Sequence, residues 1–334
     1  MRTPEFWYRS DGGSLAGMLP GLLAPAAAVY RHIAIRRSTA IRPWRAPVPV
    51  VCVGNVVAGG TGKTPVALSI GGWLARRGLN VHFLSRGYGG TLAGPVTVDP
   101  ARHTAAEVGD EPLLLAEVRP TWVARDRRDG VRAAIAAGAG GVVMDDGFQN
   151  PRVVKDVAII VIDGPRGFGN GRMIPAGPLR EPLAAALARA DAIVLIGPDA
   201  SGIANGGISQ PILRACLKPH PDAVRRLAGH TVVAFAGIGH PQKFFATLRD
   251  IGCTIVAAHA FADHHVYRPG EIAAIVRQAK TARAIPVTTA KDFVRLDAAA
   301  RAGIEVLPVD LAWDDEGALE RVLAPAMSDG GDAR

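Results

Sequence analysis

The chain has 334 residues, of which 49% are hydrophobic and 20% are charged; this balance excludes an intrinsically disordered protein and leaves room for two domains of ordinary size. Its three cysteines, Cys52, Cys216 and Cys253, lie far apart, which excludes a disulfide framework and a CxxC metal site and favours a reducing compartment. The net charge of +8 is concentrated in residues 1–50, which contain seven arginines and two acidic residues. We therefore expect this basic N-terminal segment to meet an anionic surface.

Residues 15–33 predict an amphipathic helix after the N-cap residue Ser14, because apolar residues recur there at helical spacing. Glycines and prolines interrupt the apolar run, which opposes a transmembrane span, and early acidic residues oppose a signal peptide. We therefore predict that residues 1–45 form a membrane-associating helical segment on an anionic leaflet. A helix packed on its own domain is the alternative, since amphipathicity does not separate the two. In the membrane-associating segment, the residues predicted to anchor at the level of the lipid headgroups are Trp7, Tyr8 and Trp44.

The strongest signal is the glycine-rich segment 54–64, which lies between an apolar run at 50–53 and helix-forming residues at 66–77. This strand, loop and helix order is that of a P-loop, in which backbone N–H groups converge on phosphate oxygens and a lysine adds positive charge. Val57 takes the place of the first glycine of the strict pattern. The residues predicted to bind nucleotide phosphates are Gly59, Gly60, Thr61, Gly62, Lys63 and Thr64, and the Thr64 hydroxyl is also predicted to bind Mg²⁺.

The next elements give weaker signals. A short strand at 81–84 runs into a glycine-rich turn with Tyr88, and ligand sites of open α/β sheets form at such strand ends. Asp110 and Glu111 precede a helix at 113–118, where acidic residues also serve as simple caps. Further predicted elements are a strand at 122–124 and a helix at 130–138, with Arg127 between them.

A second strong signal is the apolar run 141–144, which ends in Asp145 and Asp146. A buried strand that ends in carboxylates is the Walker B arrangement, in which an aspartate reaches the Mg²⁺ held by the P-loop threonine. The strand also follows the P-loop at the place where a doubly wound sheet would bring it alongside. We therefore predict that Asp146, and Asp145 with it, completes a magnesium site.

Two more strands are predicted, at 157–163 and 190–196, and a long loop lies between them. A loop of this length inside a compact chain is usually functional. Arg180 and Glu181, near its end, are the residues that carry chemistry.

A strand at 232–236 precedes a Gly-Ile-Gly turn, which we interpret as tight packing rather than as a second nucleotide site. A further strand at 254–257 and its loop precede His264 and His265. The side chains of adjacent histidines diverge, and no HExxH or CxxC partner exists, so we expect a general base or hydrogen-bonding histidine rather than a zinc site.

The last predicted strand, 285–289, ends just before Lys291 and Asp292. A GTPase would carry the pattern [NT]KxD for guanine, whereas here the lysine and the aspartate are adjacent. The sequence therefore favours ATP.

These elements predict an α/β fold, with a P-loop NTPase-like, mostly parallel sheet flanked by helices, a second smaller α/β lobe and the N-terminal amphipathic helix. We expect residues 46–155 to form a P-loop kinase domain that residues 295–334 complete. Residues 156–294 are expected to form the second α/β domain.

In combination, the motifs resemble one known family. They lie at residues 6–8, 53–65, 84–89, 109–112, 145–149, 175–182 and 263–265. From residue 6 to about residue 296, the chain is similar to tetraacyldisaccharide 4'-kinase, the lipid A 4'-kinase family of Gram-negative bacteria. It departs from the family pattern at Asn150, Ala262 and Ala290, where the family usually has His, often Pro, and Glu.

The resemblance implies transfer of the γ-phosphate of ATP to the 4'-hydroxyl of tetraacyldisaccharide 1-phosphate, which gives lipid IV-A in lipid A biosynthesis. The implied cofactors are ATP and Mg²⁺. The implied partners are the acylated lipid substrate and the anionic inner membrane, with the protein peripheral on its cytoplasmic face. We expect no nucleic acid as a partner, because the arginines flank an apolar helix without interleaved aromatic residues, and no obligate protein partner.

The resemblance also implies roles for single residues. Asp110 would be the general base, oriented by His264, and Arg180 and Lys63 would stabilise charge on the transferring group. The expected magnesium ligands are Thr64 and Asp146, with Asp145 and Glu111. The residues expected to contact the substrate are Tyr88, Arg127, Gln149, Asn170, Arg180 and Glu181. Because these residues come from both halves of the chain, we expect the site to be completed when the two lobes close.

Two other classes of protein are compatible with some of these signals. A membrane-recruited switch ATPase would share the P-loop and the amphipathic helix, but it would hydrolyse ATP without a sugar acceptor. A non-enzymatic basic protein with a degenerate nucleotide fold is opposed by the intact Lys63, Thr64 and aspartate pair. The identity of the phosphate acceptor therefore distinguishes the kinase from these two alternatives.

Overall fold

The computed structural model describes residues 4–8, 15–39 and 41–328. Its larger domain is built on a nine-stranded sheet with the order β13-β8-β7-β6-β1-β5-β2-β4-β3. The seven inner strands are parallel, and only the edge strands β3 and β13 are antiparallel to their neighbours. The strands are β1 Val50–Gly54, β2 Val81–Ser85, β3 Val96–Thr97, β4 Thr121–Val123, β5 Gly141–Asp145, β6 Val157–Asp163, β7 Ala192–Ile196, β8 Ile212–Pro219 and β13 Val309–Trp313.

Helices cover both faces of this sheet, which explains why its central strands are apolar at almost every position. Alternate residues of β1 face opposite sides, so Val50 and Cys52 belong to one hydrophobic cluster and Val51 and Val53 to the other. Helices α6 and α7 pack on the first side, and α3 and α13 pack on the second. The helices of this domain are α3 Lys63–Arg76, α4 Ala105–Val108, α5 Asp110–Ala116, α6 Arg127–Ala136, α7 Leu183–Leu187, α13 Glu316–Leu323 and α14 Pro325–Ser328.

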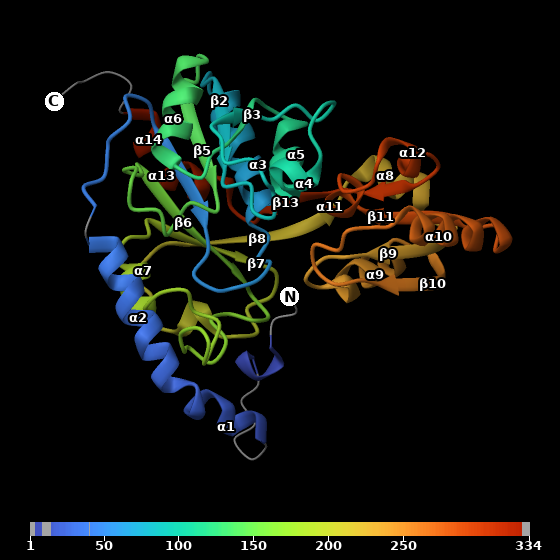
Figure 1. Cartoon of the computed structure of the whole chain (residues 1–334), viewed down its shortest axis with the longest axis horizontal. Helices are drawn as coiled ribbons and strands as arrows, with labels where there is room; N and C mark the ends of the chain where they lie inside the picture. Colours follow the sequence, from blue (N-terminus) through green and yellow to red (C-terminus); the bar gives the residue numbers. More distant parts are fainter. Residues whose placement is uncertain (1–3, 9–14, 40, 329–334) are drawn as a thin grey trace.

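A smaller α/β domain lies beside the larger one, at the right of Figure 1. Its sheet has four parallel strands in the order β10-β9-β11-β12, and two hydrophobic clusters lie on its two faces. The strands are β9 Thr231–Ala236, β10 Thr254–Ala260, β11 Ile285–Thr289 and β12 Glu305–Leu307. The helices are α8 Pro221–Leu227, α9 Pro241–Asp250, α10 Pro269–Thr281, α11 Ala290–Phe293 and α12 Ala298–Arg301.

The expected domain boundary after residue 155 is wrong. Strand β6 pairs with β1 in the middle of the large sheet, and β7 and β8 extend the same sheet outward. The second domain therefore begins after β8 and ends before β13, so the chain crosses between the domains twice, on neighbouring antiparallel strands. Of the residues expected to complete the larger domain, those of β13 and α13 lie in it, whereas β12 belongs to the second domain.

The N-terminal segment contains the 3₁₀ helix η1 Glu5–Trp7 and two helices, α1 Leu15–Leu22 and α2 Ala24–Thr39. The expected single helix is thus divided by a turn at Leu23. Helix α2 lies along the outside of the large domain (Figure 1), and Ala27 packs against its core. Within the described part of the chain, none of the helices combines the length and the apolar character that crossing a membrane requires.

Candidate active site

The P-loop joins the central strand β1 to helix α3, so the six predicted phosphate-binding residues lie at the carboxyl edge of the sheet or in the first turn of α3. The buried Asn55 side chain holds the loop from inside, because its Nδ2 donates to Gly59 O and Thr61 Oγ1, both at 3.3 Å. Gly62 has a φ of +82° and immediately precedes the helix. A side chain is strained in that conformation, so the turn requires glycine.

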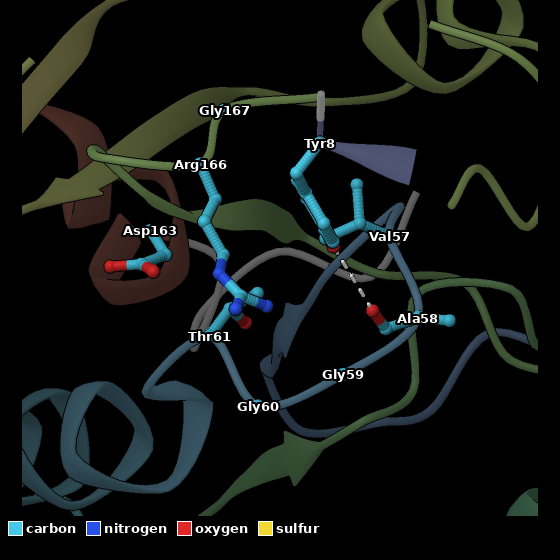
Figure 2. A pocket seen from close by; sticks show the side chains of 9 residues that line it. All are labelled: Tyr8, Val57, Ala58, Gly59, Gly60, Thr61, Asp163, Arg166 and Gly167. Carbon is cyan, nitrogen blue, oxygen red and sulfur yellow. Dashed lines mark hydrogen bonds between the residues drawn. The ribbon is translucent and has the colours of Figure 1, made fainter. Parts of the chain in front are cut away.

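A small pocket lies over this loop and also involves residues from the chain's start and from the end of β6. Figure 2 shows Tyr8 and Arg166 on the open side of the loop, and the Tyr8 hydroxyl lies 3.5 Å from Ala58 O. The Arg166 guanidinium stacks on the Tyr8 ring at 4.5 Å. These contacts connect the N-terminal segment directly to the predicted phosphate site.

Asp145 at the end of β5 and Asp146 directly after it lie beside the P-loop, as predicted, because β5 pairs with β1 in register. Thr64 Oγ1 donates to Asp145 Oδ2 at 2.8 Å, and Asp146 Oδ1 lies 3.7 Å from Lys63 Nζ and 3.3 Å from Arg180 Nη1. The other Asp145 oxygen is buried without a hydrogen-bond partner. A threonine hydroxyl beside a buried carboxylate oxygen is a donor set that suits Mg²⁺, so the residues fit this ion.

The two aspartates differ in charge environment. Burial raises the pKa of Asp145 to about 6. Burial also acts on Asp146, but the positive charges of Lys63, Arg180 and Arg127 outweigh it and lower the pKa of that carboxyl. A bound cation would stabilise the ionised form of Asp145, which is the costly one in its absence.

Asp110 and His264 meet across the boundary between the two domains. Asp110 begins α5 in the large domain, His264 lies in the loop after β10 in the small domain, and His264 Nδ1 is 3.2 Å from Asp110 Oδ1 and 3.0 Å from Oδ2. The Asp110 side chain is 6% exposed and that of His264 is 32% exposed. Although burial acts in the opposite sense, hydrogen bonding to His264 and the charges of Lys291 and Arg295 lower the pKa of Asp110.

Glu111 lies next to this pair but already has a partner, because Lys291 Nζ is 2.8 Å from Glu111 Oε1. Carboxylate or imidazole atoms of Asp110, Glu111 and His264 nevertheless lie within 4.8 Å of one another. The expected metal role of Glu111 therefore stays a prediction, and any ion that it holds competes with Lys291.

The residues expected to contact substrate fall into two groups. Tyr88 is 67% exposed and its ring lies 5.8 Å from that of His264. Gln149 Nε2 donates to Glu181 Oε1 at 3.1 Å, and Arg180 contacts Asp146, so these side chains line the same edge.

Arg127 and Asn170 belong to the second group, which supports the site from behind. Arg127 is 2% exposed and donates to Ala124 O and Asp146 O, so the expected substrate contact is corrected to support of the aspartate turn. Asn170 Nδ2 donates to Ala176 O at 2.9 Å, and its backbone N–H donates to Trp7 O at 2.7 Å. Asn170 thus shapes its own loop.

Sequence reasoning missed Arg295, which donates to the Asp110 carboxylate from the small domain. The available signal was its spacing, since Arg295 follows Lys291 by four residues and both side chains reach Asp110. That signal is weak, because nothing in the local sequence indicates which distant carboxylate such a pair would meet.

The chain is similar to known proteins over almost its whole length. The family model described as Tetraacyldisaccharide-1-P 4'-kinase, LpxK, matches residues 19–328. A Tetraacyldisaccharide 4'-kinase of Rhodospirillum centenum is 54% identical over 98% of this chain and 97% of its own, and one of Gluconacetobacter diazotrophicus is 52% identical over 97% of each chain. The crystal structure of LpxK from Aquifex aeolicus in complex with ATP has a TM-score of 0.72 and 25% identity, and the match covers 92% of this chain and 99% of that one.

Proposed function

Because the chain belongs to the tetraacyldisaccharide-1-P 4'-kinase family, we propose that it transfers the γ-phosphate of ATP to the 4'-hydroxyl of tetraacyldisaccharide 1-phosphate, forming lipid IV-A. The observation that carries this proposal is the meeting of Asp110 and His264 across two domains beside a P-loop. Phosphoryl transfer needs charge neutralisation, positioning and a group that accepts one proton. The P-loop with its neighbouring residues and the Asp110–His264 pair can together supply all three.

The loop amides and Lys63 hold the phosphates of ATP. Thr64, Asp145 and Asp146 would hold Mg²⁺, which would neutralise charge on the phosphate oxygens. Arg180 lies 3.3 Å from Asp146 and so stands where it can stabilise charge on the transferring group. Glu111 is a further candidate ligand of the ion.

The Asp110 and His264 pair accepts the proton of the attacking hydroxyl. The Asp110 carboxylate is ionised at neutral pH, so it can accept a proton when the substrate binds. His264 contacts this carboxylate and is the more exposed member of the pair, so it orients Asp110, and its ring lies beside that of Tyr88.

The lipid substrate calls for a peripheral position on the cytoplasmic face of the inner membrane. Large apolar side chains of α1 and α2 are exposed, namely Met18, Leu22, Val29 and Ile33. Arg31 is exposed among them and is able to meet anionic headgroups. These features support α1 and α2 as the membrane-contacting elements, although Ala27 packs on the protein's own core.

The direct test follows the label of γ-labelled ATP in the presence of Mg²⁺ and detergent-dispersed tetraacyldisaccharide 1-phosphate. We expect the label on the lipid, and we expect a Lys63→Ala variant to lose this transfer. Label released as free phosphate with or without lipid would instead indicate a switch ATPase and would overturn the proposal.

A second measurement tests the proton-accepting pair. Asp110→Ala and His264→Ala should each lower kcat by about 10²- to 10⁴-fold, while ATP binding measured by calorimetry stays close to that of the unsubstituted protein. Loss of ATP binding in either variant would contradict the role of the pair in proton transfer.

A further inference from the structure

The carboxylate of Asp110 is held by a second small-domain residue, the buried Arg295. Arg295 Nε donates to Asp110 Oδ2 at 2.9 Å, and Nη2 contacts the same oxygen. The two side chains are each 6% exposed and lie 185 residues apart in the sequence. His264 Nδ1 lies 3.2 Å from Oδ1 and 3.0 Å from Oδ2, so two small-domain residues together fix the orientation of the carboxylate.

Arg295 is itself fixed inside the small domain. Its Nη1 donates to Gly237 O at 2.7 Å and to Asp292 Oδ1 at 2.9 Å. Asp292 is fully buried, and it also accepts hydrogen bonds from Gly237 N, Tyr267 Oη and Thr289 Oγ1, at 2.9, 2.9 and 2.6 Å. The guanidinium therefore has a defined position that does not depend on the large domain.

The charges explain why this arrangement belongs to the interface of the domains. Asp292 and Arg295 form a buried pair in one domain, and Asp110 brings a second carboxylate from the other. A planar guanidinium presents several N–H groups in a rigid fork, so it can bind two carboxylates at set angles, whereas the three N–H donors of a lysine rotate and set no such angles. Lys291 also approaches Asp110, but at 3.8 Å and with Glu111 as its nearer partner.

We propose that Arg295 is a positioning residue for the phosphoryl transfer. Held by Asp292, it orients the Asp110 carboxylate toward His264 when the two domains meet. This inference rests on the proposed function, because it assigns Arg295 a part in placing the proton acceptor. It predicts that Arg295 acts through Asp110 and not through the binding of ATP.

The first test compares Arg295→Gln and Arg295→Lys with Arg301→Gln as the matched control. Arg301 lies in the same domain and donates hydrogen bonds to the carbonyls of Leu296 and Val294, so its loss probes local folding without touching Asp110. We expect Arg295→Gln to lower kcat about 10²-fold with little change in KM for ATP. Arg295→Lys should fall between this variant and the unsubstituted enzyme, and Arg301→Gln should keep its kcat.

The second test is a double-mutant cycle between Arg295→Gln and Asp110→Asn. If Arg295 acts through Asp110, the arginine substitution has little further effect on kcat once the carboxylate is gone. The proposal would be overturned if the double variant lost kcat by the product of the two single-variant factors, or if the kcat of Arg295→Gln were normal. A kcat loss that Arg301→Gln reproduces at an equal drop in Tm would also overturn it.

The outcome is separable from that of the proposed function. If the unsubstituted protein places no label on the lipid, the kinase proposal fails before any variant is compared. If it does label the lipid and the Arg295 variants behave as the Arg301 control does, the kinase stands and the role of Arg295 fails.

Discussion

At the scale of single residues, the buried carboxylate of Asp145 lowers the stability of the folded protein when it is ionised. Its carboxylate is buried, one oxygen has no hydrogen-bond partner, and burial raises its pKa to about 6. An ionisable group whose folded-state pKa exceeds the unfolded value of about 3.9 favours folding when protonated and opposes it when ionised. The stability that it contributes is complete below about pH 4 and is lost as the pH rises through 6.

The first prediction follows from this sign. Asp145→Asn cannot ionise, so without Mg²⁺ or ATP it should be more stable than the unsubstituted protein at pH 7.5, by up to about 3 kcal/mol. The gain should shrink toward zero near pH 4. Thermal unfolding across this pH range measures it.

The neighbouring aspartate provides the matched control. The pKa of Asp146 is lowered by Lys63, Arg180 and Arg127 against the effect of burial, so Asp146→Asn should lower stability at neutral pH. Both substitutions should impair Mg²⁺-dependent transfer. A pH-independent gain for Asp145→Asn, or a gain for both variants, would contradict this account of the two charges.

At the scale of elements, the N-terminal segment has two separable parts. Residues of η1 are bound to the active-site loops, since Trp7 Nε1 donates to Pro175 O at 3.1 Å and Trp7 is buried. Helices α1 and α2 instead expose apolar side chains to the surroundings. Deletion of residues 1–40 would remove both parts, so point substitutions in α2 are the cleaner probe of membrane contact.

Val29→Ser with Ile33→Ser should weaken co-sedimentation with anionic phosphatidylglycerol vesicles about tenfold or more, because each apolar side chain contributes roughly 1.5–3 kcal/mol when fully buried. ATP affinity should not change. The control is Val256→Ser, which replaces a valine that is 50% exposed on strand β10 of the small domain. Equal sedimentation of the two variants would remove α2 from the membrane-contacting surface.

At the scale of the whole molecule, charged side chains connect the two domains on both sides of the site. Lys291 reaches Glu111 from α11, and Lys243 of α9 lies 2.7 Å from Asp163 at the end of β6. Within residues 41–328, two neighbouring strands carry the chain across the boundary. Such a connection permits rotation of one domain against the other, so the ion pairs bias the closed arrangement.

A variant with Lys243→Ala and Lys291→Ala should therefore show a larger radius of gyration by small-angle scattering in the absence of nucleotide. Arg226→Ala is the matched control, because Arg226 pairs with Glu305 inside the small domain. Salt should reduce the difference between the two variants, since partly exposed ion pairs are partly screened. An unchanged radius in the lysine variant would mean that other contacts hold the domains together.

The local sequence was sufficient for the P-loop, the aspartates after β5 and most parallel strands, because each depends on a short pattern of apolar, glycine and charged residues. Strands β3, β8, β12 and β13 were not predicted. They are short or lie toward sheet edges, and partly exposed residues such as those of β8 lack a continuous apolar run.

The tertiary structure decided which domain each strand joins and which charges meet. The strands within residues 157–219 belong to the large sheet. In the sequence they come after the expected P-loop domain, where a second domain could equally well begin. The tertiary structure also brought Arg295 to Asp110 and Lys291 to Glu111 from the far end of the chain. Contacts of this kind depend on the packing of two complete domains, so the local sequence pattern does not predict them. A P-loop, in contrast, is built from consecutive residues, so its sequence pattern predicts it.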